Sequence, residues 1–338
     1  MNPIIILSNY TSMGGEKYMT PQDLITLCKG HKVWIQTHNY PDPDAISTAF
    51  GLQQLLRHYE IKSHILYYGK IDKLSSQKLL KLCGISMHSY DDIRDTMHEE
   101  DMIILVDCQK GTSNTLNLIG DERAVIDHHP VVDGSYEYTD LRITGACASI
   151  ISSYYQELGI RPSKKVATAL LYGLKMDTFQ FSRGVTPFDI HMFSYLFNFI
   201  DPALLKGLET NNMEFSDLKA YGAAIENIQV FGNMAFSHVD FICPDALVAV
   251  LSDFLLSLEE IDVVCVYARR RDGMKVSVRS ERPDVHAGSL AREALDGWCK
   301  AGGHAVMAGG SIPGDIVKEF GDGFDEAIVG RFLKVLNM

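Results

Sequence analysis

The 338-residue chain lacks the long apolar runs that membrane-spanning helices need. The stretch Ile4-Ile5-Ile6-Leu7 is too short for a signal peptide and has no basic flank, so we expect neither a membrane anchor nor a secretion signal. The seven cysteines include no Cys-x-x-Cys pair, which is typical of free thiols in a reducing compartment. These absences predict a cytoplasmic protein.

The chain also lacks an excess of basic residues. Lys and Arg total 31 against 43 Asp and Glu, which gives a formal net charge of −12. Sequence-independent binding of long nucleic acid depends on neutralising phosphates with Lys and Arg, so we expect no long duplex partner. A short phosphorylated ligand is not excluded, because two bound divalent cations would reverse the sign of the charge locally.

What the sequence does have is an ordinary globular composition, with 46% apolar and 22% charged residues, and a length that suggests two domains. In the first half, strand-like runs alternate with helix-like segments. The strands are expected at residues 32–37, 63–68, 102–106 and 124–126, and the helices at 45–59, 75–83 and 146–158. This alternation predicts an α/β domain with a largely parallel sheet and helices on both faces.

The remainder of the chain predicts a second, smaller domain. Residues 164–215 are expected to be mostly helical, and a polar stretch near the end of this segment, at 210–214, is a candidate connection between the domains. The strands beyond it are expected at 228–231, 235–239, 262–268 and 274–279, with a helix at 244–258. This pattern favours a mixed-sheet α/β domain. We therefore expect a first domain at 1–210, a linker at 211–227 and a second domain at 228–338.

Acidic and histidine side chains follow an apolar run in the pattern H-x-x-x-D-x-D, formed by His38, Asp42 and Asp44. Pro41 and Pro43 restrict the backbone and would fix the direction of the two carboxylates. The alternative is a capped helix start, with Asp44 as the N-cap and Asp42 as a turn residue.

Three further sites of this kind occur along the chain. Asp107 and the sequence Asp127-His128-His129-Pro130 each end an apolar strand-like run, and Asp177 is the only acidic residue in an apolar helix-like segment. A strand-terminal Asp can be a turn former and a His pair can be incidental, but an unpartnered buried carboxylate is costly. In parallel sheets, ligands gather at the carboxyl ends of the strands. These oxygen and nitrogen donors predict one centre for Mn²⁺ or Mg²⁺ rather than a structural zinc site.

In this order, the four motifs resemble those of the DHH phosphoesterase superfamily. The segment Ala301-Gly302-Gly303-His304, which continues to Gly310, resembles the glycine-rich signature of its DHHA1 domain. The resemblance implies that residues 1–210 form the DHH catalytic domain and residues 228–338 the DHHA1 substrate-binding domain. The pattern is most similar to that of the small two-domain oligoribonucleases (nanoRNases), which are also known as phosphatases of 3′-phosphoadenosine 5′-phosphate.

The resemblance also implies roles for particular residues. Two divalent cations are expected, Mn²⁺ before Mg²⁺. Their ligands would be His38, Asp42, Asp44, Asp107, His128 and Asp177, with Asp107 bridging both ions. The implied catalytic residues are His129, which would face the scissile phosphate, Asp107, and Asp127, which would orient a neighbouring histidine. The implied substrate-holding residues are Arg279, Ser280, Gly302, Gly303 and His304.

The implied function is hydrolysis of phosphodiester or phosphomonoester bonds in short oligonucleotides or nucleotide phosphates by a two-metal-activated water. The alternatives are a cyclic-dinucleotide phosphodiesterase, a hydrolase like the inorganic pyrophosphatases and an inactive nucleotide-binding sensor. The Gly302-Gly303-His304 element counts against the pyrophosphatase branch, and the complete ligand set counts against inactivity. Phe179 stands where relatives commonly carry Gly, which affects the substrate pocket more than the metal site. No residue pattern supports an oligomeric state, so a homodimer remains an open alternative.

Overall fold

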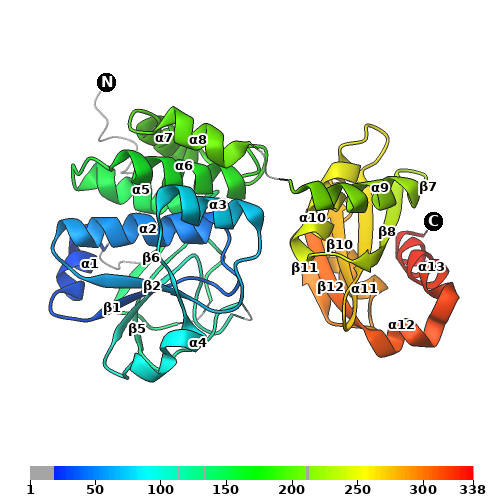
Figure 1. Cartoon of the computed structure of the whole chain (residues 1–338), viewed down its shortest axis with the longest axis horizontal. Helices are drawn as coiled ribbons and strands as arrows, with labels where there is room; N and C mark the ends of the chain where they lie inside the picture. The colour runs from blue at the N-terminus through cyan, green and yellow to red at the C-terminus, as the bar shows by residue number, and fades with distance from the viewer. Residues whose placement is uncertain (1–18, 113, 133, 211–212, 338) are drawn as a thin grey trace. The chain divides into compact units, whose positions relative to one another are not determined.

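The computed structural model describes residues 19–112, 114–132, 134–210 and 213–337. The chain divides into two compact units, residues 1–212 and 213–338, each with its own sheet and its own apolar core (Figure 1). Among the helices of the described segments, none combines the length and the apolar character required to cross a lipid bilayer.

The first unit is built on a six-stranded sheet in which all neighbouring strands are parallel. The strand order is β3-β2-β1-β4-β5-β6. The strands are β1 (Val33–Gln36), β2 (Ser63–Tyr67), β3 (His88–Ser89), β4 (Met102–Val106), β5 (Asp121–Asp127) and β6 (Tyr138–Leu141). The order reverses at β1, which lies between β2 and β4, and such switch points are where open α/β sheets bind ligands at their carboxyl edge.

Both faces of this sheet are buried, as expected of parallel strands. In β4, Ile104 and Val106 belong to the large core on one face, whereas Ile103 and Leu105 belong to a smaller cluster on the other. The alternation follows from the two-residue period of a strand. A continuous apolar run in the sequence therefore fills two cores, and its last residue leads directly into the polar edge of the sheet.

Longer helices cover the face with the large core, and α2 lies between the sheet and the pair α5 and α6 (Figure 1). The helices of the first unit are α1 (Pro21–Cys28), α2 (Pro43–His58), α3 (Leu74–Cys83), α4 (Tyr90–Ile93), α5 (Cys147–Glu157), α6 (Lys164–Asp177), α7 (Pro187–Phe197) and α8 (Pro202–Glu209), with a 3₁₀ turn at Arg94–Thr96. Tyr90 and Ile93 of the short α4 pack on the opposite face.

Glycines let α2 and α6 approach closely. A Cβ on Gly173 of α6 would lie 2.0 Å from the Oγ of Ser47 and 3.1 Å from the carbonyl oxygen of Pro43, at the start of α2. Because Gly has no Cβ, the two backbones can approach without this clash. The packing brings the first turn of α2, which carries Asp44, close to the last turn of α6, which carries Asp177.

The second unit has a mixed six-stranded sheet in the order β11-β12-β10-β9-β8-β7, in which only β8 and β9 pair in parallel among the described residues. Its strands are β7 (Gln229–Phe231), β8 (Met234–Ile242), β9 (Val263–Arg269), β10 (Gly273–Ser280), β11 (Ala301–Gly303) and β12 (Met307–Pro313). Its helices are α9 (Leu218–Glu226), α10 (Asp245–Leu256), α11 (Ala287–Ala294), α12 (Gly314–Phe320) and α13 (Phe324–Leu336), with 3₁₀ turns at Phe215–Asp217 and Gly321–Gly323. Helices α9 and α10 pack on one face, and α11 and α13 on the other.

The predicted fold class is confirmed in both units. Several elements were not predicted from the sequence, among them β3, β6, β12, α11 and α13. The two-residue β3 is too short for a periodicity, and β6 reads Tyr-Thr-Asp-Leu, without an apolar run. The segment 211–227, expected as a linker, contains α9, which packs against β8 of the second unit.

Candidate metal centre

Asp107 lies at the centre of the site, where β4 reaches the carboxyl edge of the sheet. Its backbone has φ = 57°, and its N–H donates to the carbonyl oxygen of Ile126 at 2.9 Å. Positive φ is uncommon for residues other than Gly, although Asp tolerates it better than most. The side chain is 3% exposed, and its Oδ1 has no hydrogen-bond partner among the described residues. The local conformation therefore holds a buried carboxylate oxygen open for a ligand.

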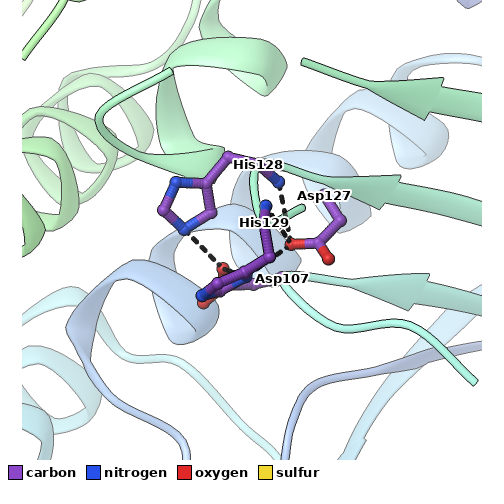
Figure 2. A group of neighbouring side chains, drawn as sticks. All are labelled: Asp107, Asp127, His128 and His129. Atoms are coloured by element: carbon purple, nitrogen blue, oxygen red, sulfur yellow. Dashed lines mark hydrogen bonds and ion pairs between the residues drawn. The ribbon is translucent and has the colours of Figure 1, made fainter. Parts of the chain in front are cut away.

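Two histidines present their Nε2 atoms to this carboxylate. The His38 Nδ1 lies 2.8 Å from the carbonyl oxygen of Asn39, and the His128 Nδ1 lies 2.9 Å from that of Thr144. A carbonyl can only accept, so Nδ1 carries the proton in each ring and Nε2 keeps its lone pair when the ring is neutral. The Nε2 of His38 lies 3.6 Å from the Oδ2 of Asp107. The Nε2 of His128 lies 3.2 Å from the Oδ1 of Asp107, a contact drawn in Figure 2.

The remaining predicted ligands complete two groups around Asp107. His38, Asp42 and Asp107 each offer a ligand atom within 4.8 Å of the others, and so do Asp44, His128 and Asp177. The Nε2 of His38 lies 3.8 Å from an oxygen of Asp42, and the Nε2 of His128 lies 3.5 Å from an oxygen of Asp177. All six residues predicted as metal ligands thus lie together, and they come from four separate parts of the first unit.

The start of α2 differs from the capped-helix alternative. Asp42, not Asp44, is the N-cap, and its Oδ1 accepts from the N–H groups of Asp44 and Ala45 at 2.9 and 3.1 Å. Asp44 instead accepts from the N–H groups of Cys147 and Ala148 at 2.7 and 3.0 Å, at the N-terminus of α5. Unpaired N–H groups at a helix start favour an anion there. The Asp44 carboxylate is therefore fixed between two helices and is 1% exposed.

The carboxyl groups of the cluster disfavour one another's ionisation. Burial raises the pKa of Asp44 well above its usual range, and the charges of Asp107 and Asp177 add to this effect. Burial likewise raises the pKa of Asp177 to about 6, with further contributions from Asp42 and Asp107. Burial and neighbouring negative charge thus make the carboxylates of Asp44 and Asp177 harder to form, and a bound cation would relieve that repulsion.

In the two inward-facing imidazoles it is the charged form that the cluster favours. Burial alone would lower the pKa of His38, but the hydrogen bond and the charge of Asp42 outweigh it, and with Asp107 they raise the pKa to about 9. For His128, burial is likewise outweighed by Asp107 and Asp44, and the pKa lies well above its usual value. Protons thus occupy positions that a divalent cation would take over, because a metal-ligating imidazole must be neutral.

The donor set fits a hard divalent cation. Lone pairs on Nε2 face carboxylate oxygens at 3.2–3.6 Å, an arrangement in which two acceptors oppose each other unless a proton or a cation lies between them. The buried Oδ1 of Asp107 has no hydrogen bond. The groups contain carboxylates and imidazoles and no thiolate within the described residues, which suits Mn²⁺ or Mg²⁺.

Asp127, the last residue of β5, lies beside Asp107 and His128 but has a different environment from the predicted ligands. Its Oδ1 accepts from the backbone N–H of His128 at 2.8 Å and lies 2.8 Å from the Nδ1 of His129 (Figure 2). Its Oδ2 accepts from the side-chain amide of Gln109 at 2.7 Å. Both oxygens are occupied, so this carboxylate fixes the orientation of His129. The hydrogen bond to Asp127 raises the pKa of His129, whose side chain is 45% exposed.

Two buried residues without a predicted role form hydrogen bonds that hold the carboxyl edge of the sheet in place. Gln109, 1% exposed, donates to Asp127 and to the carbonyl oxygen of Pro130 at 3.1 Å, and its Oε1 accepts from the N–H of Val132 at 2.8 Å. Gln109 lies two positions after Asp107, and that proximity was the only signal in the sequence.

The second is Asp189, which is 0% exposed and lies in the first turn of α7. It accepts from the Thr144 hydroxyl at 2.7 Å, the Gly145 N–H at 2.8 Å and the Ser149 hydroxyl at 2.6 Å. Because the carbonyl of Thr144 holds the His128 ring, Asp189 fixes the loop that orients a predicted ligand. The sequence showed only a helix-capping pattern at this position.

The predicted substrate-holding residues all lie in the second unit. Arg279 is 8% exposed and is bound to Asp253 at 2.5 Å and to the Ser277 hydroxyl at 3.1 Å. Ser280 is buried, and its hydroxyl accepts from the N–H of Arg282 at 3.2 Å. Arg279 is therefore engaged with its own unit, and a ligand phosphate would compete with Asp253 for it.

The glycine-rich segment is more accessible. Gly302 and Gly303 belong to the edge strand β11, and His304 is exposed in the turn to β12. A Cβ on Gly288 of α11 would lie 2.2 Å from the carbonyl oxygen of Gly303, so the strand touches the helix through bare backbone. Gly303 itself has φ = 155°, a value that favours glycine.

Family models match both units. The model of the DHH family N-terminal domain matches residues 32–174, and that of the DHHA1 domain matches residues 232–330. The first match contains five of the six predicted ligands, and the second contains all the predicted substrate-holding residues.

Several curated proteins are similar over most of the chain. An uncharacterised protein of Methanocaldococcus jannaschii is 31% identical over 90% of this chain, which spans 64% of that protein's length. A probable bifunctional oligoribonuclease and PAP phosphatase, NrnA, of Streptococcus mutans is 24% identical over 81% of this chain and 87% of its own length. A cyclic-di-AMP phosphodiesterase, GdpP, of Geobacillus thermodenitrificans is 26% identical over 90% of this chain, which spans 48% of that protein.

Solved structures share the fold. An exopolyphosphatase-related protein from Bacteroides fragilis has a TM-score of 0.71 with 20% identity, over 91% of this chain and 96% of its own. RecJ from Thermus thermophilus, solved with Mn²⁺, has a TM-score of 0.52 with 13% identity, over 92% of this chain and 54% of its own. At these identities the likeness concerns the fold alone.

Proposed function

Because the chain belongs to the DHH/DHHA1 phosphoesterase superfamily, whose members are metal-dependent hydrolases, we propose that it is a Mn²⁺-dependent hydrolase of phosphoester bonds in short oligonucleotides or nucleotide phosphates. One observation carries the proposal. The lone pairs of two imidazoles face the carboxylate of Asp107 on both sides, with further carboxylates beside each imidazole. Mg²⁺ is the second candidate cation, because it prefers the same oxygen donors.

The two groups of side chains divide naturally between two cations. His38 and Asp42 would hold one, Asp44, His128 and Asp177 would hold the other, and Asp107 would serve both. Cations held there would offset negative charge on a phosphoryl group and make water acidic enough to supply hydroxide near neutral pH.

The protein's own residues supply orientation and a proton. Asp127 accepts from the Nδ1–H of His129, so the Nε2 of that ring is directed away from the hydrogen bond. Because the same bond raises the pKa of His129 above its ordinary value, the ring stays protonated to a higher pH than a free imidazole would. We propose that His129 donates its Nε2 proton to the departing sugar oxygen, which is general-acid catalysis. Gln109 keeps Asp127 in the position that this step requires.

The relatives' activities support the substrate class. The S. mutans protein is named as an oligoribonuclease and PAP phosphatase and the G. thermodenitrificans protein as a cyclic-di-AMP phosphodiesterase, and all of these substrates are small and carry nucleotides. Gly302, Gly303 and His304 offer accessible backbone and an exposed imidazole in the second unit for holding such a substrate. The seven cysteines are free thiols, which supports a reducing, cytoplasmic location.

A turnover panel with purified full-length protein and Mn²⁺ tests the proposal. The substrates are pApA, pGpG, a short linear RNA, 3′-phosphoadenosine 5′-phosphate, cyclic di-AMP and pyrophosphate. We expect release of mononucleotides from the linear compounds or of phosphate from 3′-phosphoadenosine 5′-phosphate. The matched control is Asp107→Asn, which keeps the shape of the side chain and removes its charge.

The outcomes separate the alternatives. Turnover confined to cyclic di-AMP or to pyrophosphate would assign the chain to another branch of the superfamily. No turnover of any compound by metal-loaded protein would overturn the hydrolase proposal and favour a nucleotide-binding sensor. Equal turnover by Asp107→Asn would contradict the assignment of the metal centre.

A further inference from the structure

The chain adopts an unusual backbone directly after α6. Three consecutive residues other than Gly have positive φ: Phe179 at 48°, Gln180 at 57° and Phe181 at 67°. The left-handed region brings Cβ too close to the following carbonyl for most residues, and it is visited mainly by Gly, Asn and Asp as single residues. A run of three, two of them phenylalanines, is strained unless its surroundings compensate.

Hydrogen bonds and packing explain part of this run. The Gln180 N–H donates to the carbonyl oxygen of Lys175 at 2.7 Å, and the Arg183 N–H donates to that of Thr178 at 2.9 Å. Phe181 packs against the large core of the first unit, and its ring centroid lies 5.0 Å from that of Phe193 in an edge-to-face arrangement. Buried apolar area therefore compensates for the strain at Phe181.

Phe179 has no such compensation. Its side chain is 54% exposed, and it belongs to none of the apolar clusters of the described residues. Glycine would adopt φ = 48° without strain and would lose little buried area there. The chain therefore holds an exposed aromatic ring in an unfavourable backbone conformation that folding alone does not require. Strain of this kind is concentrated at functional sites.

The location of Phe179 indicates which part of a ligand is within its reach. It lies two residues after Asp177, whose Oδ2 is 3.5 Å from the Nε2 of His128. Two peptide units span at most about 7 Å, so the Cα of Phe179 lies within that distance of the Cα of Asp177. An exposed side chain at this position is within reach of a nucleotide whose phosphate is bound at the cluster. Aromatic rings beside phosphate-binding groups bind nucleotides by stacking on a base, which every base permits.

Resting on the proposed function, we propose that Phe179 is a specificity-determining residue that stacks on the nucleobase next to the scissile phosphate. The ring would favour substrates that carry a base at that position over phosphate-only compounds, with little preference among bases. The substrate class is thereby narrowed to nucleotides and short oligonucleotides with a base beside the reacting phosphorus.

The test compares a dinucleotide with its abasic analogue on the metal-loaded full chain. We measure KM for pApA and for the same compound without the base at each position in turn, in the native protein and in Phe179→Ala. The native protein should show a KM that rises about tenfold when the stacked base is removed. In Phe179→Ala that ratio should fall to about one for the same position. Once the ring is absent, removing the base on which it stacks has no further effect on KM.

Three variants control for indirect effects. Phe179→Trp should restore the ratio. Phe197→Ala removes a ring of similar exposure, 56%, at the end of α7 and should leave the ratio unchanged. Phe179→Gly should unfold at a temperature no lower than that of the native protein, since it relieves the strain.

The results distinguish this inference from the proposed function. If native protein hydrolyses pApA but the ratio persists in Phe179→Ala, the stacking role is wrong and the hydrolase assignment stands. If native protein hydrolyses neither compound, the proposed function fails as well. A lower unfolding temperature for Phe179→Gly would show that the ring supports the fold, and it would overturn the argument from strain.

Discussion

Removing one carboxylate from the metal centre should stabilise the metal-free protein, although it removes a ligand. Asp177 has its pKa raised from 3.8 to about 6, by burial first and then by Asp42 and Asp107, despite the opposing charge of His128. A carboxyl whose pKa is higher in the folded protein than in the unfolded chain contributes stability at low pH. This contribution is fully present below the pKa in the unfolded chain, near 4, and is lost as the pH rises through the pKa in the folded protein, about 6. Above that pH the ionised Asp177 is a cost.

The magnitude follows from the shift. At about 1.36 kcal/mol for each pKa unit, the change from 3.8 to about 6 corresponds to roughly 3 kcal/mol. The side chain is 27% exposed, so solvent screening reduces this to about 1–3 kcal/mol. Each kcal/mol shifts the midpoint of a domain of this size by about 2–4 °C. Asp177→Asn should therefore raise the unfolding temperature at pH 8 by roughly 2–12 °C.

The assay is thermal unfolding followed by circular dichroism in the presence of a chelator, at pH 4.5 and pH 8. We expect the gain at pH 8 and almost none at pH 4.5, where the native carboxyl is largely protonated. Asp95→Asn, at a position where the side chain is 94% exposed, should change neither value. With Mn²⁺ in place of the chelator, the native protein should gain stability and Asp177→Asn should gain less. A variant less stable than the native protein at both pH values would refute the reasoning.

Three substitutions away from the predicted ligands test the supporting structure. Gln109→Ala leaves an oxygen of the buried Asp127 without its donor, so we expect a loss of about 1–3 kcal/mol in urea unfolding and about a 10–100-fold lower kcat. Asp189→Asn places an amide where a carboxylate accepts several donors, and calorimetry should show about tenfold weaker Mn²⁺ binding with the fold retained; unchanged affinity would exclude a positioning role. Gly288→Ala would place a Cβ 2.2 Å from the Gly303 carbonyl, and we expect a higher KM with a smaller change in kcat; an unchanged KM would separate this contact from substrate binding.

The gathering of His38, Asp107 and His128 could be foreseen because they follow apolar strands, and parallel strands end at one edge of the sheet. Asp107 and His128 are clear examples, since β4 and β5 are neighbours. Asp177 instead ends the helix α6. Pattern alone also sufficed for α2, α5, α6 and α10 and for the fold class, whereas the 13-residue α13 was not predicted.

Contacts between distant residues could not be foreseen. Asp189 acts on Thr144 and Gly145 from 45 and 44 positions away, and no local period links them. Asp44 looked like the cap of its own helix, but it binds the N-terminus of α5 more than a hundred residues later, and Asp42 takes the capping role. The left-handed run at Phe179 also escaped prediction, because nothing in Thr-Phe-Gln-Phe signals positive φ.

The central claim is that one centre in the first unit holds two divalent cations that share Asp107. The most direct test is a Mn²⁺ titration of metal-free protein, followed by electron paramagnetic resonance of the free ion, in native protein and in Asp107→Asn. We predict two Mn²⁺ bound per native chain, both weakened by the substitution, because Asp107 belongs to one group and its Oδ1 lies 3.2 Å from the Nε2 of His128 in the other. A native chain that binds no Mn²⁺, or a variant that binds two as tightly as the native chain, would contradict the account.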